Sequence, residues 1–406
     1  MQPITAQPGT SQQTSAQGRP LPRGRWIWRL FGILVVLTCG ILVCLATVKA
    51  GTGTQDVFVQ SALPTRTVIV PETVTSVNVT SYGAPIQVTT GPSSETTVTE
   101  TISFDEKMGP PRVMEHVARG TLTLAAPACQ NSPCSVGFAV TVPAGVTVTA
   151  ASGGAPVMVS GAAAADVNSG GGTVGASDIK GLLTVAAGGG DITVTGAGSA
   201  SLDSGSGAVS VSGVPGPLNV SAEGGEIDVH GIGSATLDSG GGPVNASGVA
   251  GTLTVTTEGG SINASVVQGA NLDSGSGPVV ARAIDGPLNV HTEGGSLQVN
   301  GLAGALVAGT GSGPLNASGL NSATARVSTD GGNVWLGFTS APQSVQVTAQ
   351  SGNAVLVLPG GPYAVSAQSL GGPVDVSVPV SQTAARTVSV STTGGELQVK
   401  PPAGGN

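Results

Sequence analysis

Apolar and polar residues alternate along most of this chain, and pairs of glycine interrupt the alternation at regular intervals. The recurring pattern is L-x-V-x-x-x-G-G-x-I-x-V, as in Leu253, Val255, Gly259, Gly260 and Ile262. Such alternation is typical of a strand with one buried face. The glycine pairs indicate turns, where we expect positive φ angles. The sequence therefore predicts a succession of short strands joined by Gly-rich turns.

These strands belong to a repeat of 35 residues that contains two similar halves. Copies occupy Gly181–Pro215, Gly216–Ala250 and Gly251–Asp285, and a copy that is one residue longer occupies Gly286–Asn321. A half-repeat of 17 or 18 residues is too short for a helical repeat but fits one coil of a β-solenoid, whose coils stack about 4.8 Å apart. The predicted fold class is all-β, a single-chain β-solenoid. A β-sandwich or β-propeller built from the same strands is the alternative.

The pattern divides the chain into segments of different regularity. The strand patterns are irregularly spaced over 67–150, where we expect the charged insertion Phe104–Gly120 to form a loop. End coils often differ in this way because they must protect exposed strand edges. The expected order is a disordered tail at 1–29, an apolar segment at 30–48, a linker at 49–66, irregular coils at 67–150, regular coils at 151–400 and a tail at 401–406.

The apolar segment Leu30–Val48 contains 19 residues and no charge. As a helix it would span about 28 Å, close to the thickness of the hydrocarbon core of a bilayer. Four arginines precede it, and only Lys49 follows directly. By the positive-inside rule, the sequence predicts a single-pass membrane anchor with a cytoplasmic N-terminus and an extracytoplasmic body. A cleaved signal peptide, with Val48-Lys49-Ala50 near the cleavage site, is the alternative.

The body is acidic and contains two cysteines. Residues 51–406 hold nine basic residues against 22 acidic ones, a net charge of about −13. Such a body lacks the basic surface that nucleic acids require. Cys129 and Cys134 are separated by four residues, which favours a disulfide in an exported protein, with free thiols or a metal site as alternatives.

One stretch resembles a known group of proteins. The sequence VTVPAGVTVTA at Val140–Ala150, followed by the glycine-punctuated coils, resembles the bacterial putative-adhesin family over residues 65–400. The Cys-x-x-x-x-Cys before it is similar to actinobacterial members. The resemblance implies a β-solenoid in the cell envelope, and it brings no catalytic residues.

Two sets of acidic residues recur with the repeat. Asp203, Asp238 and Asp273 each lie in an L-D-S-G sequence, and a second set, each member before a Gly pair, comprises Glu223, Glu258, Glu293 and Asp330. We expect each set to form a stripe with two coils, about 10 Å, between its members. Calcium binding is one interpretation, and turn capping by the aspartates with charges that block sheet aggregation is the other. We predict no cofactor and no established metal site.

Aromatic residues are scarce after residue 150, where only Trp335, Phe338 and Tyr363 occur. They could form a small ligand platform, or they could plug the end of the solenoid. The histidines are scattered and no paired carboxylates or nucleophile with its base can be identified, so we predict that the protein is not an enzyme. The predicted function is adhesin-like binding to cell-wall polymer or an envelope protein. A regulatory accessory that docks a membrane partner and, less favoured, a polysaccharide-active enzyme are the alternatives.

Overall fold

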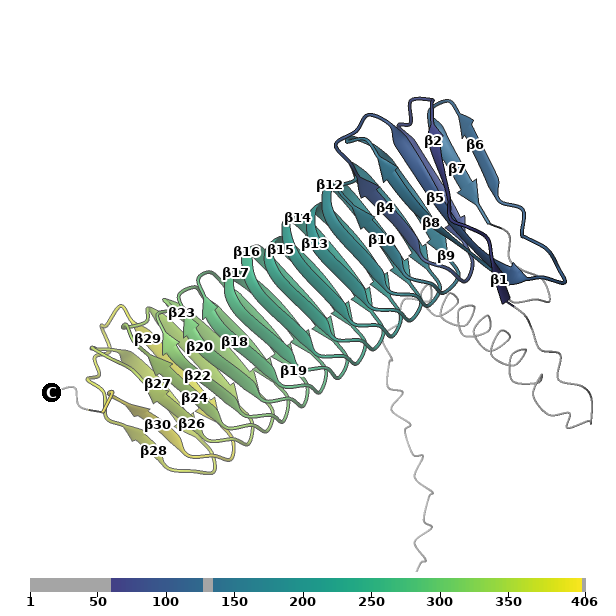
Figure 1. Ribbon diagram of the computed structural model, residues 1–406. Coiled ribbons are helices and arrows are strands. Elements are labelled where there is room, and N and C mark those ends of the chain that lie inside the picture. Colours follow the sequence, from purple (N-terminus) through teal and green to yellow (C-terminus); the bar gives the residue numbers. More distant parts are fainter. Residues whose placement is uncertain (1–59, 127–133, 404–406) are drawn as a thin grey trace, which may run out of the picture. The chain divides into compact units, whose positions relative to one another are not determined.

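The computed structural model describes residues 60–126 and 134–403, which form a rod of stacked β-coils (Figure 1). Strands of successive coils pair in parallel, so that Val220 lies beside Leu237 and Leu237 lies beside Val255. The steps of 17 and 18 residues between these partners confirm the predicted β-solenoid. The predicted transmembrane segment lies outside the described residues, among which no helix could span a membrane.

Two ladders of parallel strands run along the rod, and we call them face 1 and face 2. Six long strands bend at a corner and contribute to both faces: β12 (Val174–Ala187), β13 (Ile192–Ser204), β14 (Val209–Ala222), β15 (Ile227–Ser239), β16 (Val244–Thr257) and β17 (Ile262–Ser274). The other strands of face 1 are, along the rod, β8 (Ser135–Val142), β4 (Ile86–Thr90), β10 (Val157–Ser160), β18 (Val279–Ile284), β20 (Leu297–Leu302), β22 (Leu315–Leu320), β24 (Val334–Phe338), β26 (Ala354–Val357), β30 (Leu397–Lys400) and β28 (Val374–Val376). Those of face 2 are β7 (Thr121–Ala125), β3 (Ser76–Ser81), β9 (Thr147–Ser152), β11 (Ala164–Ser169), β19 (Leu288–Thr292), β21 (Leu306–Thr310), β23 (Thr324–Thr329), β25 (Ser344–Ala349), β29 (Thr387–Thr392) and β27 (Ala364–Ser369).

The core is one continuous column of aliphatic side chains between the two faces. Inward positions stack on equivalent positions of the next coil, as Leu237, Val255 and Leu272 do on face 2, each at most 2% exposed. Because each coil buries its apolar side chains against both neighbours, the hydrophobic effect stabilises the stack as a whole rather than any isolated coil.

The glycine pairs are not needed for positive φ angles, which the sequence had predicted at these turns. No φ between +20° and +160° occurs at Gly259 or Gly260, and positive φ angles lie instead at the corner between the faces, as at Gly231 (65°) and Gly248 (64°). The second glycine of the Gly259–Gly260 pair is required by close approach, because a Cβ on Gly260 would lie 2.0 Å from the backbone oxygen of Gly242. The turns of successive coils are therefore stacked backbone on backbone.

A buried hydroxyl closes many of these turns from inside. Ser274 is fully buried, and its Oγ donates to the carbonyl oxygen of Gly277 at 3.0 Å. Thr257 makes the same bond to Gly260 at 2.9 Å in the preceding coil. In the L-D-S-G turns, the serine that follows the aspartate makes this bond, from Ser204 to Gly207, from Ser239 to Gly242 and from Ser274 to Gly277.

The N-terminal end of the rod is sealed by antiparallel strands. On face 1, β5 (Thr96–Asp105) covers the edge of β8 and is itself paired with β1 (Gln60–Ala62) and β2 (Arg66–Val70). On face 2, β6 (Met114–Ala118) covers the edge of β7. The insertion predicted as a loop therefore contains a strand, and strands already begin within the expected linker. These additions leave the outermost coil no bare parallel edge toward the N-terminus.

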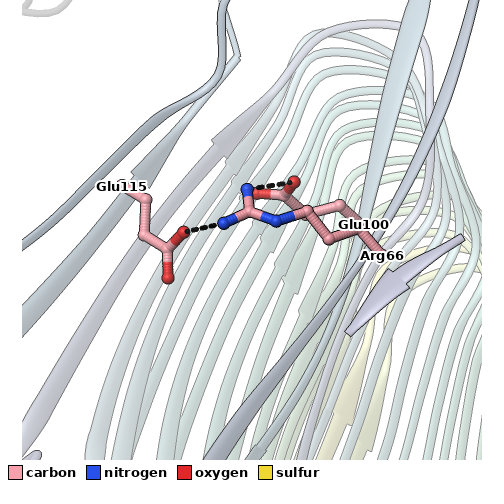
Figure 2. Close-up of polar contacts among 3 residues, drawn as sticks. All are labelled: Arg66, Glu100 and Glu115. Atoms are coloured by element: carbon pink, nitrogen blue, oxygen red, sulfur yellow. Dashed lines mark hydrogen bonds and ion pairs between the residues drawn. The ribbon is translucent and has the colours of Figure 1, made fainter. Parts of the chain in front are cut away.

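An ion-pair network joins the strands that cover the two faces at this end (Figure 2). One guanidinium nitrogen of Arg66 on β2 lies 3.4 Å from Glu100 of β5, and the other lies 3.6 Å from Glu115 of β6. Glu100 is 2% exposed, and its Oε1 has no hydrogen-bond partner. Burial raises the pKa of the Glu100 carboxyl above its usual 4.5, Arg66 opposes this rise, and Glu115 adds to it.

Glu100→Gln is expected to change how stability depends on pH. Since the pKa of Glu100 is raised on folding, the native state binds its proton more tightly, and ionised Glu100 destabilises the fold. The wild type should therefore gain stability relative to the variant as pH falls from 7 through the folded pKa. Denaturant unfolding between pH 7 and 4 measures this difference, with Glu72→Gln as the control, because Glu72 is exposed and lies outside the ion-pair network. A constant difference across this range would contradict the assignment.

The C-terminal end is built out of sequence order. The last strands, β29 and β30, lie between β25/β26 and β27/β28, although β27 and β28 precede them in the chain. Among the described residues, no strand pairs with the outer edges of β27 and β28. Leu370, in the turn between these two strands, is 84% exposed. One end of the rod is thus covered by antiparallel strands, and we call it the sealed end, while the other finishes in strands of the parallel ladders, and we call it the open end.

Candidate functional site

The outward side chains of face 2 form straight columns along the rod, because the register is maintained from coil to coil. One column contains Asp203, Ser221, Asp238, Thr256 and Asp273, each paired with the next. The predicted aspartate stripe is therefore present, with a hydroxyl residue between successive aspartates. At about 4.8 Å per coil, neighbouring aspartates are about 10 Å apart, too far to share one cation.

The second acidic stripe lies at the adjacent turns. The backbone nitrogen of Glu258 donates to the Gly240 oxygen at 3.1 Å, and that of Glu293 donates to the Gly275 oxygen at 2.8 Å. The same turn position is occupied by Glu223 and Asp330. In the part of the chain that the structure describes, no three potential metal ligands come together. The geometry gives the calcium interpretation no support.

The three aromatic residues do not share a surface. Phe338 and Tyr363 are buried in the core, at 4% and 0% exposure, and the Tyr363 hydroxyl donates to the Pro359 oxygen at 2.5 Å. Trp335 alone points outward, on face 1, with 37% exposure. Phe338 and Tyr363 thus fill the core of the C-terminal coils, and a joint ligand platform is not formed.

The predicted disulfide falls at the gap in the described residues. Cys129 lies within residues 127–133, outside the described part of the chain, so the Cys129–Cys134 bond stays a prediction. Cys134 directly precedes β8, in the outermost coil at the sealed end.

A depression lies on face 2 across β16, β17, β19, β21, β23 and β25. It has a volume of about 530 Å³, and we call it the central hollow. Its outward lining includes Asn271, Asp273, Asn289, His291, Val307, Gly309, Arg326, Ser328 and Gln346. These side chains come from consecutive coils, in the columns Asp273–His291–Gly309–Ser328 and Asn271–Asn289–Val307–Arg326–Gln346.

Hydrogen bonds between coils order part of this lining. Asn289 Nδ2 donates to Asn271 Oδ1 at 2.9 Å, and Arg326 Nε donates to Gln346 Oε1 at 3.2 Å. His291 and Arg326 are both exposed, and they flank the coil that carries Gly309. The sequence did not reveal this site, because its residues come from two repeats and from the coils after residue 321, and only the register brings them together.

The other two histidines are remote from the hollow. His230 shares a hydrogen bond of 2.9 Å with Ser247 on face 1, and His116 lies on β6 at the sealed end. Neither contacts a carboxylate in the hydrogen bonds of the described residues. The histidines therefore do not form a shared catalytic arrangement with one another.

Comparison with known proteins gives matches only among solved structures. No protein-family model matches the chain, and no curated protein matches its sequence. A putative cell adhesion protein from Clostridium sporogenes matches 83% of this chain and 99% of its own, at 8% identity and a TM-score of 0.17.

Two further solved structures come from other bacteria. A putative adhesin from Bacteroides fragilis matches 83% of this chain and 97% of its own, at 12% identity and a TM-score of 0.19. One from Parabacteroides distasonis covers the same shares at 13% identity and a TM-score of 0.22. These TM-scores are too low to transfer a function. The chain is similar to solved structures described as bacterial adhesins, and its own activity has to be argued from its surface.

Proposed function

We propose that this protein is an adhesin-like, non-enzymatic rod of the bacterial cell envelope that binds an envelope polymer through face 2. The observation that carries the proposal is a column of outward hydroxyl and amide side chains on that face, Ser201–Asn219–Thr236–Thr254–Asn271–Asn289, which leads into the central hollow. A rigid row of donors and acceptors about 4.8 Å apart suits a repeating hydrophilic polymer. The anchor at Leu30–Val48 would hold the rod at the membrane.

The chain enters the rod at its sealed end, since β1 and β2 belong to the N-terminal cap. A membrane anchor at residues 30–48 would thus connect to the sealed end. The coils that carry the central hollow lie further along the rod, between the cap and the open end. This order is compatible with presenting face 2 to polymer outside the membrane.

Sedimentation with purified cell wall tests the proposal. The full chain, kept soluble in detergent, should bind wall freed of protein in a saturable way at physiological salt. Bovine serum albumin, which is also acidic, serves as the control for trapping in the pellet. Absence of saturable retention would contradict wall binding. Release of reducing sugar during the incubation would contradict the non-enzymatic role.

A second candidate function is docking of a membrane protein partner, and the open end of the rod favours it. The edges of β27 and β28 have no strand partner among the described residues, and Leu370 and Val374 are 84% and 43% exposed. Unpaired edges of this kind accept a strand from another chain. Capture of one stoichiometric membrane protein, lost in a Leu370→Lys variant, together with no wall binding, would select this function over the first.

A further inference from the structure

Gly309 is an unusual residue for its position in the central hollow. It lies in the middle of β21 with its position facing outward, where a glycine destabilises a strand by about 0.5–1 kcal/mol relative to alanine. Its backbone does not require glycine, because its φ is not positive. A Cβ there would meet only side chains, His291 Nδ1 at 3.0 Å and Ser328 Oγ at 3.6 Å.

The turn glycines show what a structural requirement looks like in this fold. In the next turn of the same coil, a Cβ on Gly313 would lie 1.8 Å from the Gly295 oxygen, a backbone atom that cannot move away. No backbone atom lies this close to the Cβ position of Gly309, where the tight neighbour is the imidazole of His291, a side chain that can shift. A glycine within a strand also marks places where a ligand approaches the backbone closely. The missing side chain at residue 309 deepens the hollow between His291 and Ser328.

Arg326 can bind an anionic group beside this gap. His291 lies one coil before Gly309 and Arg326 one coil after it, so their positions are about 10 Å apart along the rod. The bond from Arg326 to Gln346 uses Nε, and a guanidinium has four further N–H donors. Arginine binds carboxylates through such paired donors. On a rod that is acidic overall, and with Asp273 beside His291 in the same column, Arg326 and the imidazole N–H of His291 define a local site rather than a long-range field.

The rest of the lining suits a hydroxylated chain. Asn271, Asn289 and Gln346 offer amide donors and acceptors, which match hydroxyl groups that both donate and accept. Val307, beside Gly309, is 44% exposed and offers an apolar floor to the C–H face of a sugar ring. The columns run along the rod, so one sugar unit can lie on each coil.

We propose that the central hollow binds a carboxylate-bearing polysaccharide that lies along the rod. One carboxylate would lie over Gly309, between the guanidinium of Arg326 and the imidazole of His291. The proposal rests on the proposed function of face 2, and it adds the ligand class and the residues.

Titration calorimetry of the full chain with polygalacturonate oligomers tests the site. Arg326→Gln should weaken binding about tenfold through loss of the charge-assisted pair. Gly309→Val should weaken it at least as much by filling the gap, while valine suits the strand. Arg282→Gln removes the same charge from an exposed position of β18 on face 1 and should bind as the wild type does. Circular dichroism confirms that each variant is folded.

The competing ligands separate the outcomes. Neutral dextran should not bind, and binding of polyphosphate without polygalacturonate would overturn the carboxylate assignment. Equal affinity of the wild type, Arg326→Gln and Gly309→Val would overturn the site. If the variants bind polygalacturonate as tightly as the wild type and also bind the wall saturably, the inference fails while the proposed function stands. If the wild type binds neither wall nor polygalacturonate, both fail.

Discussion

Gly260→Ala is expected to destabilise the rod by about 3 kcal/mol, near the upper end of overpacking effects. The added Cβ would lie 2.0 Å from the oxygen and 2.7 Å from the carbonyl carbon of Gly242 in the turn of the preceding coil. Both are backbone atoms held by the same stack, so separating the coils is the only relief. Equilibrium unfolding in denaturant measures the change, followed by circular dichroism in the strand region.

The neighbouring glycine provides a matched control. A Cβ on Gly259 would have Ser276 Oγ as its nearest neighbour outside the adjacent residues, at 3.7 Å, which is ordinary contact. Gly259→Ala should therefore change stability by less than about 0.5 kcal/mol. Equal losses in the two variants would show that the turns are not stacked backbone on backbone as described.

Val390→Asp is expected to open the C-terminal end of the rod, including residues that precede it in the chain. Val390 is 1% exposed in β29, between Val347 of β25 and Ala367 of β27. An unpaired charge there should destabilise the inserted coil by several kcal/mol. Because β27 and β28 are attached only through β29 and β30, amide hydrogen exchange should rise over 364–376 as well as over 387–400.

Ser389→Asp is the control for this experiment, because residue 389 is exposed on the same strand. It introduces the same charge at the surface and should leave exchange almost unchanged. If residues 364–376 stayed protected in Val390→Asp while 387–400 exchanged, the chain would stack in sequence order, and the inserted arrangement would be wrong.

The solenoid could be predicted because each coil carries its own signal. The alternation of apolar Leu253 and Val255 with polar residues specifies a strand with one buried face, and the pair Gly259–Gly260 specifies a turn. Neither signal depends on distant residues. Equal repeat length then fixes the register, which is why the column of Asp203, Asp238 and Asp273 could be anticipated. The reason for the turn glycines could not, since the clash involves the preceding coil.

Features that depend on exceptions to the repeat were missed. The sequence STTGGELQV at 391–399 matches any other coil, so nothing in it reveals that β29 and β30 insert before β27 and β28. The strand β6 was not predicted, because it lies in a charged insertion and its strand conformation depends on pairing with β7. The residue type at one position does not determine which coil lies next to it in the stack.

The central hollow belongs to the same class of feature. In the sequence, Arg326 is one of nine scattered basic residues in 51–406, and Gly309 is one of 65 glycines. Their significance comes from the register, which places His291, Gly309 and Ser328 in one column and Arg326 beside it. The predicted aromatic platform failed for the converse reason, because Phe338 and Tyr363 are needed in the core.

Hydroxyl-radical footprinting of the full chain bound to polygalacturonate tests most directly that face 2 is the binding surface. The account predicts protection of His291 and Val307 in the hollow, with no protection of Trp335 and Met158, which lie exposed on face 1. Protection at Trp335, or at Leu370 of the open end, with His291 and Val307 oxidised as in the unbound chain, would contradict it.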